Sequence, residues 1–481
     1  MFKKKSAVHN LSHSFKYSDY LGYLTPIAAI DCVPGDKINH KIHALIRTQP
    51  LLAPVMHEVD IDIHAYFSPD RLVWPESEEF HSGGDDGASV VEWPHVAAPA
   101  STGFAVGSLA DYLGFTTGVA DIECSALPFR HYQNIRNHHY RDSQLQSESV
   151  ISTASGLDTT TDLDLKRPCW KRDYFTKCRP EPQLGSEVVI PLSSDNVPVQ
   201  SDTANTGANA QVIVDPTTGE VYLNGDTLAN SGFYSDLSAV TGIPISELRE
   251  ANATQRWLEN NNTWGGRYME QLKARFGVLP QDARLQWPEF LGAGRTKIQF
   301  SEVLNQSDAG TDPVGELRGH GISVVGSNRY KYRCKEHGYL MVFMIIRPKT
   351  QYFQGLPRRY ARETRYDYLL PEFVHIGDQA VLNKEIYAAS AAPNDVFGYT
   401  PIYDEYRTEP SRIAGEMKTT LDYWHMARDF SSEPALNSDF VECTPTNRIY
   451  PATSAAQIYV NCKHTIHMRR LLPKSPSYRL M

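Results

Sequence analysis

Apolar and polar side chains alternate strictly in several segments near the two ends of this 481-residue chain. The alternation runs through residues 37–47, 59–67 and 458–466. Because successive side chains of a strand point to opposite faces of a sheet, this pattern predicts half-buried β-strands. The run 339–346 is apolar throughout, which predicts a strand covered on both faces. We therefore expect one sheet system closed by N- and C-terminal strands, with the middle of the chain inserted between them.

The middle of the chain has a different pattern. Three segments are predicted to be helical: 129–142, 245–259 and 264–276. The stretch 193–235 is rich in Ser, Thr, Asn, Asp and Gly and is interpreted as a surface excursion. Within it, residues 211–214 and 220–223 are predicted to pair as a hairpin.

No clean linker divides the chain, so we predict one β-core with long insertions instead of several independent domains. The predicted organisation is a basic N-terminal arm at 1–20, a β-core at 21–470 with an outward excursion at 193–235 and a helical insertion at 245–276, and a basic C-terminal tail at 471–481.

The net charge is −9, from 47 basic and 56 acidic residues, which excludes a protein that binds nucleic acid over its whole surface. Any nucleic-acid contact must come from a local patch, and both ends of the chain are basic. The predicted nucleic-acid-facing residues are Lys3, Lys4, Lys5, Lys463, Arg469, Arg470, Lys474, Tyr478 and Arg479. Lysines and arginines neutralise phosphates, and a tyrosine among them can stack on unpaired bases. For the N-terminal lysines, a solvated disordered tail is the alternative.

The seven cysteines are widely spaced and form no CxxC motif, which indicates reduced thiols instead of a disulfide framework or a zinc site. The basic N-terminus is not followed by an apolar run, so no signal peptide is predicted. The longest apolar run is too short to span a bilayer. We expect a soluble protein, made in a reducing compartment, without membrane insertion.

Catalytic and metal-binding patterns are weak. Adjacent His138 and His139 point about 100° apart on a helix and do not share a metal easily, so a helix-surface or subunit contact is favoured. Asp60, Asp62 and His64 share one strand face, for which a solvated or interface face is favoured over a cation site. The segment 292–296 lacks the Gly-Lys-Ser/Thr ending of a phosphate loop, which makes a turn the preferred interpretation. We predict no catalytic residue, metal or cofactor.

Several longer segments, in order along the chain, resemble the major capsid proteins of the Microviridae, particularly the gokushovirus-like branch. Three of them are Val33-Pro-Gly-Asp-Lys37, Arg275-Phe-Gly-Val278 and His375-Ile-Gly-Asp-Gln-Ala-Val-Leu-Asn-Lys-Glu-Ile-Tyr387. The similarity covers the chain from about residue 20 to about residue 470.

The resemblance implies a mainly β fold, a single viral jelly roll that carries long loop insertions with short helices. It also implies a major capsid protein that self-assembles, as a homo-oligomer, into a small icosahedral shell around a circular single-stranded DNA genome. The partners that it implies are that genome, a small basic DNA-packaging protein and a host cell-surface receptor. The protein is then expected in the virion, after assembly in the bacterial host cytoplasm.

A shell protein must bury surface against several neighbours, and the segments 352–360 and 362–368 are dense in aromatic residues and arginine. The predicted subunit-interface residues are Tyr352, Phe353, Arg358, Arg359, Tyr360, Arg365 and Tyr366. Packing of these loops within one subunit is the alternative.

Two other function classes fit the sequence less well. A secreted all-β carbohydrate-binding protein or glycoside hydrolase fits the aromatic content but requires a signal peptide. A plain single-stranded DNA-binding protein should be compact and basic, whereas this chain is long and acidic.

Overall fold

The computed structural model of the protein forms two compact units, Met1–Pro180 with Gln281–Met481, and Glu181–Pro280. It describes residues 6–84, 89–185, 199–201, 212–214, 221–223, 233–235, 245–264, 274, 286–304, 317–327 and 329–474.

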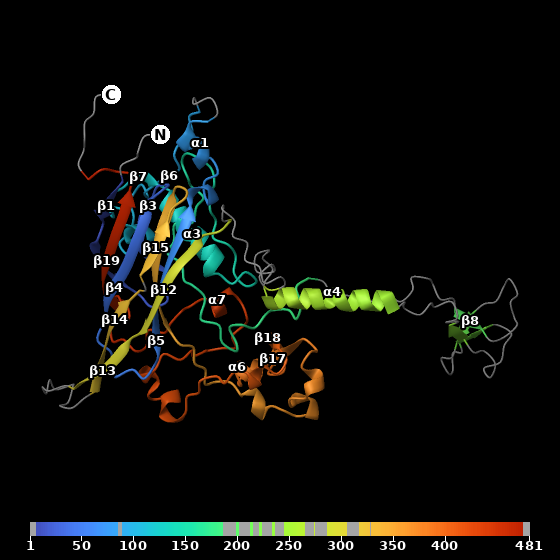
Figure 1. Ribbon diagram of the computed structural model, residues 1–481. Coiled ribbons are helices and arrows are strands. Elements are labelled where there is room, and N and C mark those ends of the chain that lie inside the picture. Colours follow the sequence, from blue (N-terminus) through green and yellow to red (C-terminus); the bar gives the residue numbers. More distant parts are fainter. Residues whose placement is uncertain are drawn as a thin grey trace. The chain divides into compact units, whose positions relative to one another are not determined.

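The larger antiparallel sheet of the first unit has seven strands (Figure 1). They are β1 (Ala7–Asn10), β2 (His13–Asp19), β4 (Lys37–Thr48), β13 (Gln299–Leu304), β14 (Leu317–Gly326), β15 (Tyr330–Arg333) and β19 (Ile458–Arg470). β19 pairs with β1 and β2 on one side and with β4 on the other, and β4 continues the sheet through β14 and β15. The N-terminal strands β1 and β2 thus pair with the C-terminal strand β19, which lies inside the sheet.

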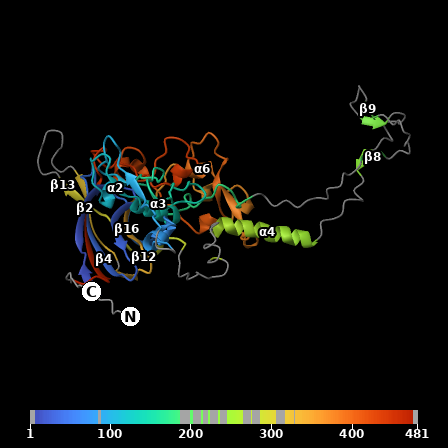
Figure 2. The ribbon, with the colours of Figure 1, turned by 90° about the horizontal axis from the view of Figure 1, so that it is seen from above.

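The second antiparallel sheet contains four strands in the order β12–β5–β16–β3. Their bounds are β3 (Thr25–Cys32), β5 (Val59–Pro69), β12 (Glu289–Lys297) and β16 (Gly338–Pro348). Figures 1 and 2 show the two sheets face to face, with helix α3 (Leu127–His139) beyond the second sheet. The fold is the predicted mainly β sandwich of jelly-roll class.

The apolar strand β16 contributes to two cores. Leu340, Val342 and Met344 pack between the sheets, together with the inward residues of β4 and β19. Met341 and Phe343 point the other way, into a cluster that includes residues of α3. Both faces of this strand are therefore buried, which confirms the prediction for residues 339–346.

The alternating segments 37–47 and 458–466 are half-buried strands, as predicted. The prediction of a half-buried strand for 59–67 is wrong, because the polar face of β5 is also covered. On that face, Asp62 is 1% and Tyr66 4% exposed. The cluster around α3 covers the face, and most of α3 is itself buried.

The turn predicted at 292–296 is instead part of strand β12. Its glycines allow the two sheets to approach each other. A Cβ on Gly294 would lie 2.7 Å from the main-chain oxygen of Gly326 in β14. The glycines therefore allow the two sheets to pack closely. The local sequence does not reveal this role, because glycine is also common in turns.

The arm predicted at 1–20 contains two strands, β1 and β2, which hydrogen-bond to β19. The apolar content of this segment is too low to predict strands without their partner.

All seven cysteines are free thiols. Among the described residues, no helix has both the length and the apolar character to cross a bilayer.

The remaining elements of the first unit are short. They are α1 (Ser77–Ser82), β6 (His95–Ala97), α2 (Leu109–Leu113), β7 (Glu123–Ser125), β17 (Asp378–Leu382), α6 (Asn383–Ile386), β18 (Val396–Pro401) and α7 (Ser438–Val441), with 3-10 turns at Asp70–Leu72, Arg358–Tyr360, Arg365–Asp367, Pro371–Phe373, Asp404–Tyr406, Gly415–Lys418 and Asp422–Trp424. A third core beneath β17 and β18 contains Phe175, Tyr352 and Phe440.

The second unit contains the predicted helix at 245–259, which extends as α4 (Ile245–Trp264). The predicted hairpin is present as β9 (Val212–Val214) and β10 (Val221–Leu223), and β8 (Val199–Ser201) pairs with β11 (Phe233–Ser235). The helix predicted at 264–276 lies almost entirely outside the described residues.

Candidate nucleic-acid and subunit interfaces

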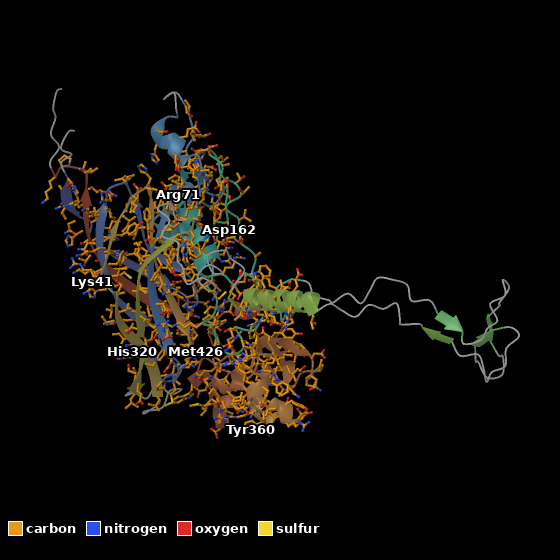
Figure 3. The ribbon with its side chains drawn as sticks, turned by 45° about the vertical axis from the view of Figure 1, so that its right-hand side comes forward. Lys41, Arg71, Asp162, His320, Tyr360 and Met426 are labelled. Atoms are coloured by element: carbon orange, nitrogen blue, oxygen red, sulfur yellow. The ribbon has the colours of Figure 1, made fainter. Side chains whose placement is uncertain are left out.

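The outer face of the larger sheet is cationic. Strand register places Lys463 of β19 opposite His43 of β4, and Arg469 opposite Lys37. Arg333 of β15 lies opposite the same Lys37. Figure 3 labels Lys41 on this side of the sheet. Eight exposed lysines and arginines form what we name the cationic face: Lys16, Lys37, Lys41, Arg47, Lys331, Arg333, Lys463 and Arg469.

The charge of the cationic face is not compensated locally. The outward positions of β2, β4, β15 and β19 carry no Asp or Glu. None of its eight cations forms an ion pair with another described residue. Tyr459, which is 48% exposed, lies opposite Arg47 on the same face. The surface therefore combines uncompensated positive charge with an exposed ring, a combination suited to phosphates and unstacked bases.

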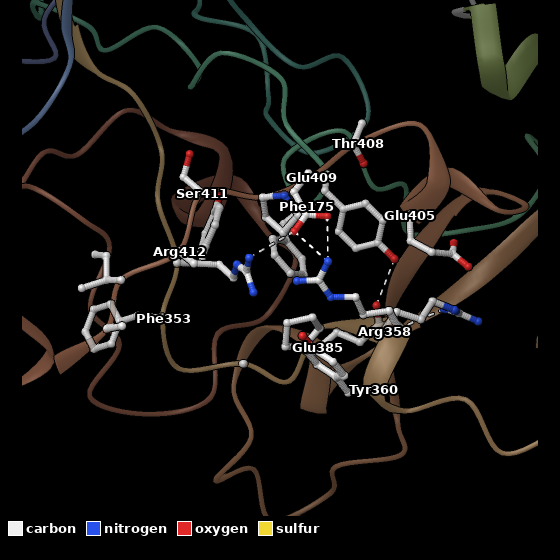
Figure 4. A pocket seen from close by; sticks show the side chains of 18 of the residues that line it. Phe175, Phe353, Arg358, Tyr360, Glu385, Glu405, Thr408, Glu409, Ser411 and Arg412 are labelled. Atoms are coloured by element: carbon white, nitrogen blue, oxygen red, sulfur yellow. Dashed lines mark hydrogen bonds and ion pairs between the residues drawn. The ribbon is translucent and has the colours of Figure 1, made fainter.

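A mainly apolar cavity of about 510 Å³ lies in the C-terminal part of the first unit (Figure 4). Its apolar lining includes Phe175, Phe353, Pro357, Tyr360 and Ile413. We name it the aromatic cavity.

The lining of the aromatic cavity contains Glu405, which pairs with Arg362, and two further charged groups. In one, Glu385 accepts hydrogen bonds from Tyr174 at 2.9 Å and from Arg358 at 3.0 Å. In the other, Glu409 is shared by Arg359, at 3.0 Å, and Arg412, at 3.9 Å. Since one carboxylate serves two guanidinium groups, this second group has a net positive charge.

A cationic sheet face and an open aromatic cavity suit a protein that binds polymers and copies of itself. The family described as "Capsid protein (F protein)" matches residues 3–477. The chain belongs to this family of capsid proteins. It is 34% identical to the capsid protein VP1 of Bdellovibrio phage phiMH2K over 467 residues, 90% of this chain and 87% of that protein. It is 30% identical to the capsid proteins VP1 of Chlamydia phage 1 and Spiroplasma virus 4, over 91% of this chain and 89% and 87% of theirs.

These relationships confirm the predicted identity as a major capsid protein of Microviridae type, a component of the virion. They do not support a secreted carbohydrate-binding protein or glycoside hydrolase. The relatives are matched along most of their length, so the whole sandwich and its insertions belong to the capsid protein.

The predicted nucleic-acid-facing residues of the capsid protein have different surroundings. Lys463 and Arg469 lie on the cationic face, and Lys474 is exposed. Arg470 is held by Asp36, with 2.9 Å between Nε and Oδ2. The other predicted residues lie outside the described residues: Lys3, Lys4, Lys5, Tyr478 and Arg479.

The predicted subunit-interface residues divide into internal and exposed groups. Tyr352 is 8% exposed and donates a hydrogen bond to Asp173, and Arg358 is tied to Glu385. These two side chains therefore serve packing within one copy. Phe353 and Arg359 line the aromatic cavity. The remaining three are exposed at the surface: Tyr360, Arg365 and Tyr366.

The strand face that carries Asp60, Asp62 and His64 is an internal ion network, not a solvated face. Asp62 lies 2.7 Å from Arg295, 3.0 Å from Arg347 and 3.1 Å from Lys171. Burial alone would raise the pKa of Asp62, but the hydrogen bonds and charges of these cations outweigh burial and lower it to about 2. Asp62 is therefore ionised and neutralised by protein groups.

The two histidines near the end of α3 also have protein partners. His138 Nδ1 lies 2.9 Å from the main-chain oxygen of Asn134, and His139 Nε2 lies 2.9 Å from that of Pro288. In the described part of the chain, no group of three His, Cys, Asp or Glu residues is arranged to hold a metal ion.

Sequence reasoning named only two residues of the cationic face, because it looked for charge at the chain ends. The alternation of residues in β4 nevertheless could have predicted part of the cationic face. If Ile38 and Ile42 face the core, alternation places Lys37, Lys41 and Arg47 together on the opposite face. The contribution of β15 depends on its pairing with β4, which the local sequence does not reveal.

Proposed function

We propose that this capsid protein encloses a circular single-stranded DNA genome in a small icosahedral shell and turns its cationic face toward the DNA. The observation that carries the proposal is the set of eight uncompensated cations on one sheet face of a protein whose net charge is −9. The protein acts by binding and assembly, without a catalytic site or cofactor.

The cationic face suits a flexible strand better than a particular base sequence. Side chains on one face of a strand repeat about every 6.6 Å, and neighbouring strands lie about 4.8 Å apart, so the cations form a two-dimensional array. Such an array neutralises phosphates along many paths and releases their counterions. The exposed ring of Tyr459 offers a stacking surface to an unpaired base.

Other partners are assigned to other surfaces. The exposed side chains of Tyr360, Arg365 and Tyr366 contact neighbouring copies in the shell. A small basic protein accompanies the DNA during packaging, in the bacterial cytoplasm. The excursion at residues 193–235 contacts the host cell-surface receptor.

The proposal is tested with the full chain carrying Lys41→Glu and Lys463→Glu. Binding to a fluorescent single-stranded oligonucleotide is measured by anisotropy. The matched control is Arg249→Glu with Arg256→Glu, an equal charge change at exposed positions of α4. We expect the first pair to weaken binding strongly and the control pair to weaken it little. Equal losses from both pairs would show a response to net charge alone and would refute the assignment of the face.

A further inference from the structure

We propose that the aromatic cavity is a socket for residues 90–93 of a second copy of this chain. The proposal rests on assembly of the capsid protein from copies of itself, and does not depend on the cationic face.

The socket has the properties of an interface hot spot. Aromatic and proline side chains line a depression of about 510 Å³ that protein atoms of the same copy leave open. Beside it, Tyr360 is 63% exposed, although its ring is large and mostly apolar. Desolvated aromatic pockets with arginine at their margin carry much of the binding energy at protein interfaces. An apolar side chain from another molecule would complete this packing.

The charged residues of the lining indicate what kind of residue should lie next to the entering apolar side chain. Glu409 already pairs with both Arg359 and Arg412, and the Arg412 side chain remains 58% exposed. Lys418 also lies in the lining and is exposed. A carboxylate next to the entering apolar group would balance these cations, so the socket fits an apolar segment that carries an acid.

Residues 90–93 have this chemistry. Val90 is 97% exposed and Trp93 is 41% exposed, so both present apolar surface to solvent. Between them, the side chain of Glu92 is 66% exposed. The surrounding sequence from residue 76 to residue 92 contains no lysine or arginine. It has six acidic residues: Glu76, Glu78, Glu79, Asp85, Asp86 and Glu92.

Residues 90–93 and the aromatic cavity lie far apart within one copy. Residues 90–93 precede β6, which lies with α1 at one end of the first unit, whereas the cavity lies near α6 at the other end (Figure 1). A copy therefore cannot fill its own socket. A contact between two different surfaces is heterologous, and repeated heterologous contacts generate rings around a symmetry axis. Such rings are needed in a closed shell, where many weak contacts add up.

The first experiment blocks the socket with Ala414→Trp, because Ala414 is an exposed part of the lining. Ala391→Trp, at an exposed alanine outside the lining, is the control. Sedimentation velocity of the full chain measures the share of protein in oligomers, and thermal unfolding checks the fold. We expect Ala414→Trp to weaken association roughly tenfold or more, as loss of a hot spot does, while the control changes little. Normal association of folded Ala414→Trp would overturn the proposal.

The second experiment identifies the occupant. Cysteines introduced together as Val90→Cys and Ala414→Cys should form disulfides between copies under mild oxidation, giving a ladder on a non-reducing gel. The control pair, Val90→Cys with Ala391→Cys, should give none. Arg412→Glu should impair association, and adding Glu92→Arg should restore it. A ladder equally strong in the control, or no restoration, would rule out residues 90–93 as the occupant.

These outcomes are separable from the proposed DNA contact. Binding of the single-stranded oligonucleotide by unassembled Ala414→Trp should equal that of the wild type, because Ala414 is not part of the cationic face. If Lys41→Glu with Lys463→Glu weakened oligonucleotide binding no more than its control pair, while Ala414→Trp still impaired association, the proposed function would be refuted and the socket would stand.

Discussion

His40 in β4 and His464 in β19 are in hydrogen-bond contact, with 3.1 Å between Nε2 of the first and Nδ1 of the second. Both side chains are fully buried. The hydroxyl of Tyr330 lies 2.7 Å from Nδ1 of His40, whereas Nε2 of His464 has no hydrogen-bond partner among the described residues. Protonation of either ring would therefore place a charge inside the sandwich, between the strands that hold the larger sheet together.

This histidine pair should make the capsid protein sensitive to acid. Burial, followed by the charge of His464, lowers the pKa of His40 to about 3, and burial lowers the pKa of His464 to about 4. An unfolded histidine has a pKa of about 6.5. Below that pH, the unfolded chain binds protons at both histidines, whereas both rings stay neutral in the folded chain. The free energy of unfolding should therefore fall by about 1.4 kcal/mol per pH unit for each histidine as the pH drops from about 6.5 toward 4.

Urea unfolding of wild type and His464→Leu at a series of pH values tests this. The variant should lose about 1.4 kcal/mol per pH unit less than wild type in that window. His467→Leu, at an exposed position of the same strand, should keep the wild-type slope. Burial raises the pKa of Asp19 to about 6, which has the opposite effect on stability but acts equally in all three proteins. Identical slopes for His464→Leu and wild type would contradict the assignment.

The cationic face predicts a specific salt dependence. The affinity for single-stranded DNA falls with salt with a logarithmic slope of about −0.7 per phosphate neutralised. Replacement of Lys41 and Lys463 by glutamine should therefore reduce the magnitude of the slope by about 1.4. Anisotropy titrations between low and moderate salt measure it. A weaker affinity with an unchanged slope would mean that these lysines do not contact phosphates.

The ion network around Asp62 should be essential for stability. Asp62→Ala leaves Arg347, whose side chain is 11% exposed, without its carboxylate, and loss of one partner of a buried pair costs about 3–5 kcal/mol. Glu58→Ala is the control, since Glu58 forms exposed pairs with Lys297 and Lys349 that are worth at most about 1 kcal/mol. Equilibrium urea unfolding compares the two. Similar small losses would show that Asp62 contributes no more than a surface ion pair.

Two glycines that face each other across the sheets should respond differently to a methyl group. On Gly294, a Cβ would lie 2.7 Å from the main-chain oxygen of Gly326, whereas a Cβ on Gly326 would first meet the His43 ring at 3.4 Å. Gly294→Ala should therefore destabilise by about 2 kcal/mol or more, and Gly326→Ala by less than about 1 kcal/mol. Thermal unfolding of both variants measures the difference. The reverse order would show that the sheets do not approach closely at β12.

Much of the sandwich follows from local patterns, because alternation is set by burial of one strand face. It predicted β4, β16 and β19, and the resemblance gave the capsid class. Strands β1 and β2 were not predicted, because their stability comes from pairing with β19, more than 400 positions away along the chain. The covered face of β5 was not predicted because α3, which covers it, comes later in the chain and leaves no trace in the alternation of β5 itself.

The interfaces were harder to predict than the strands. Tyr352 and Tyr360 belong to one aromatic segment, yet one is 8% and the other 63% exposed. Composition identifies such residues as contact-forming but does not say whether the contact is within a copy or between copies. The aromatic cavity brings together Phe175, Phe353 and Ile413, which only the folded chain places side by side.

The central position of β19 has a consequence for synthesis in the cell. A ribosome makes this strand after every other strand of the larger sheet. Until then β1 and β2 lack the strand with which they pair, and one edge of β4 stays unpaired. A nascent chain therefore cannot complete the sandwich while it is being translated. The larger sheet, and the cationic face that lies on it, therefore forms only after β19 has been synthesised.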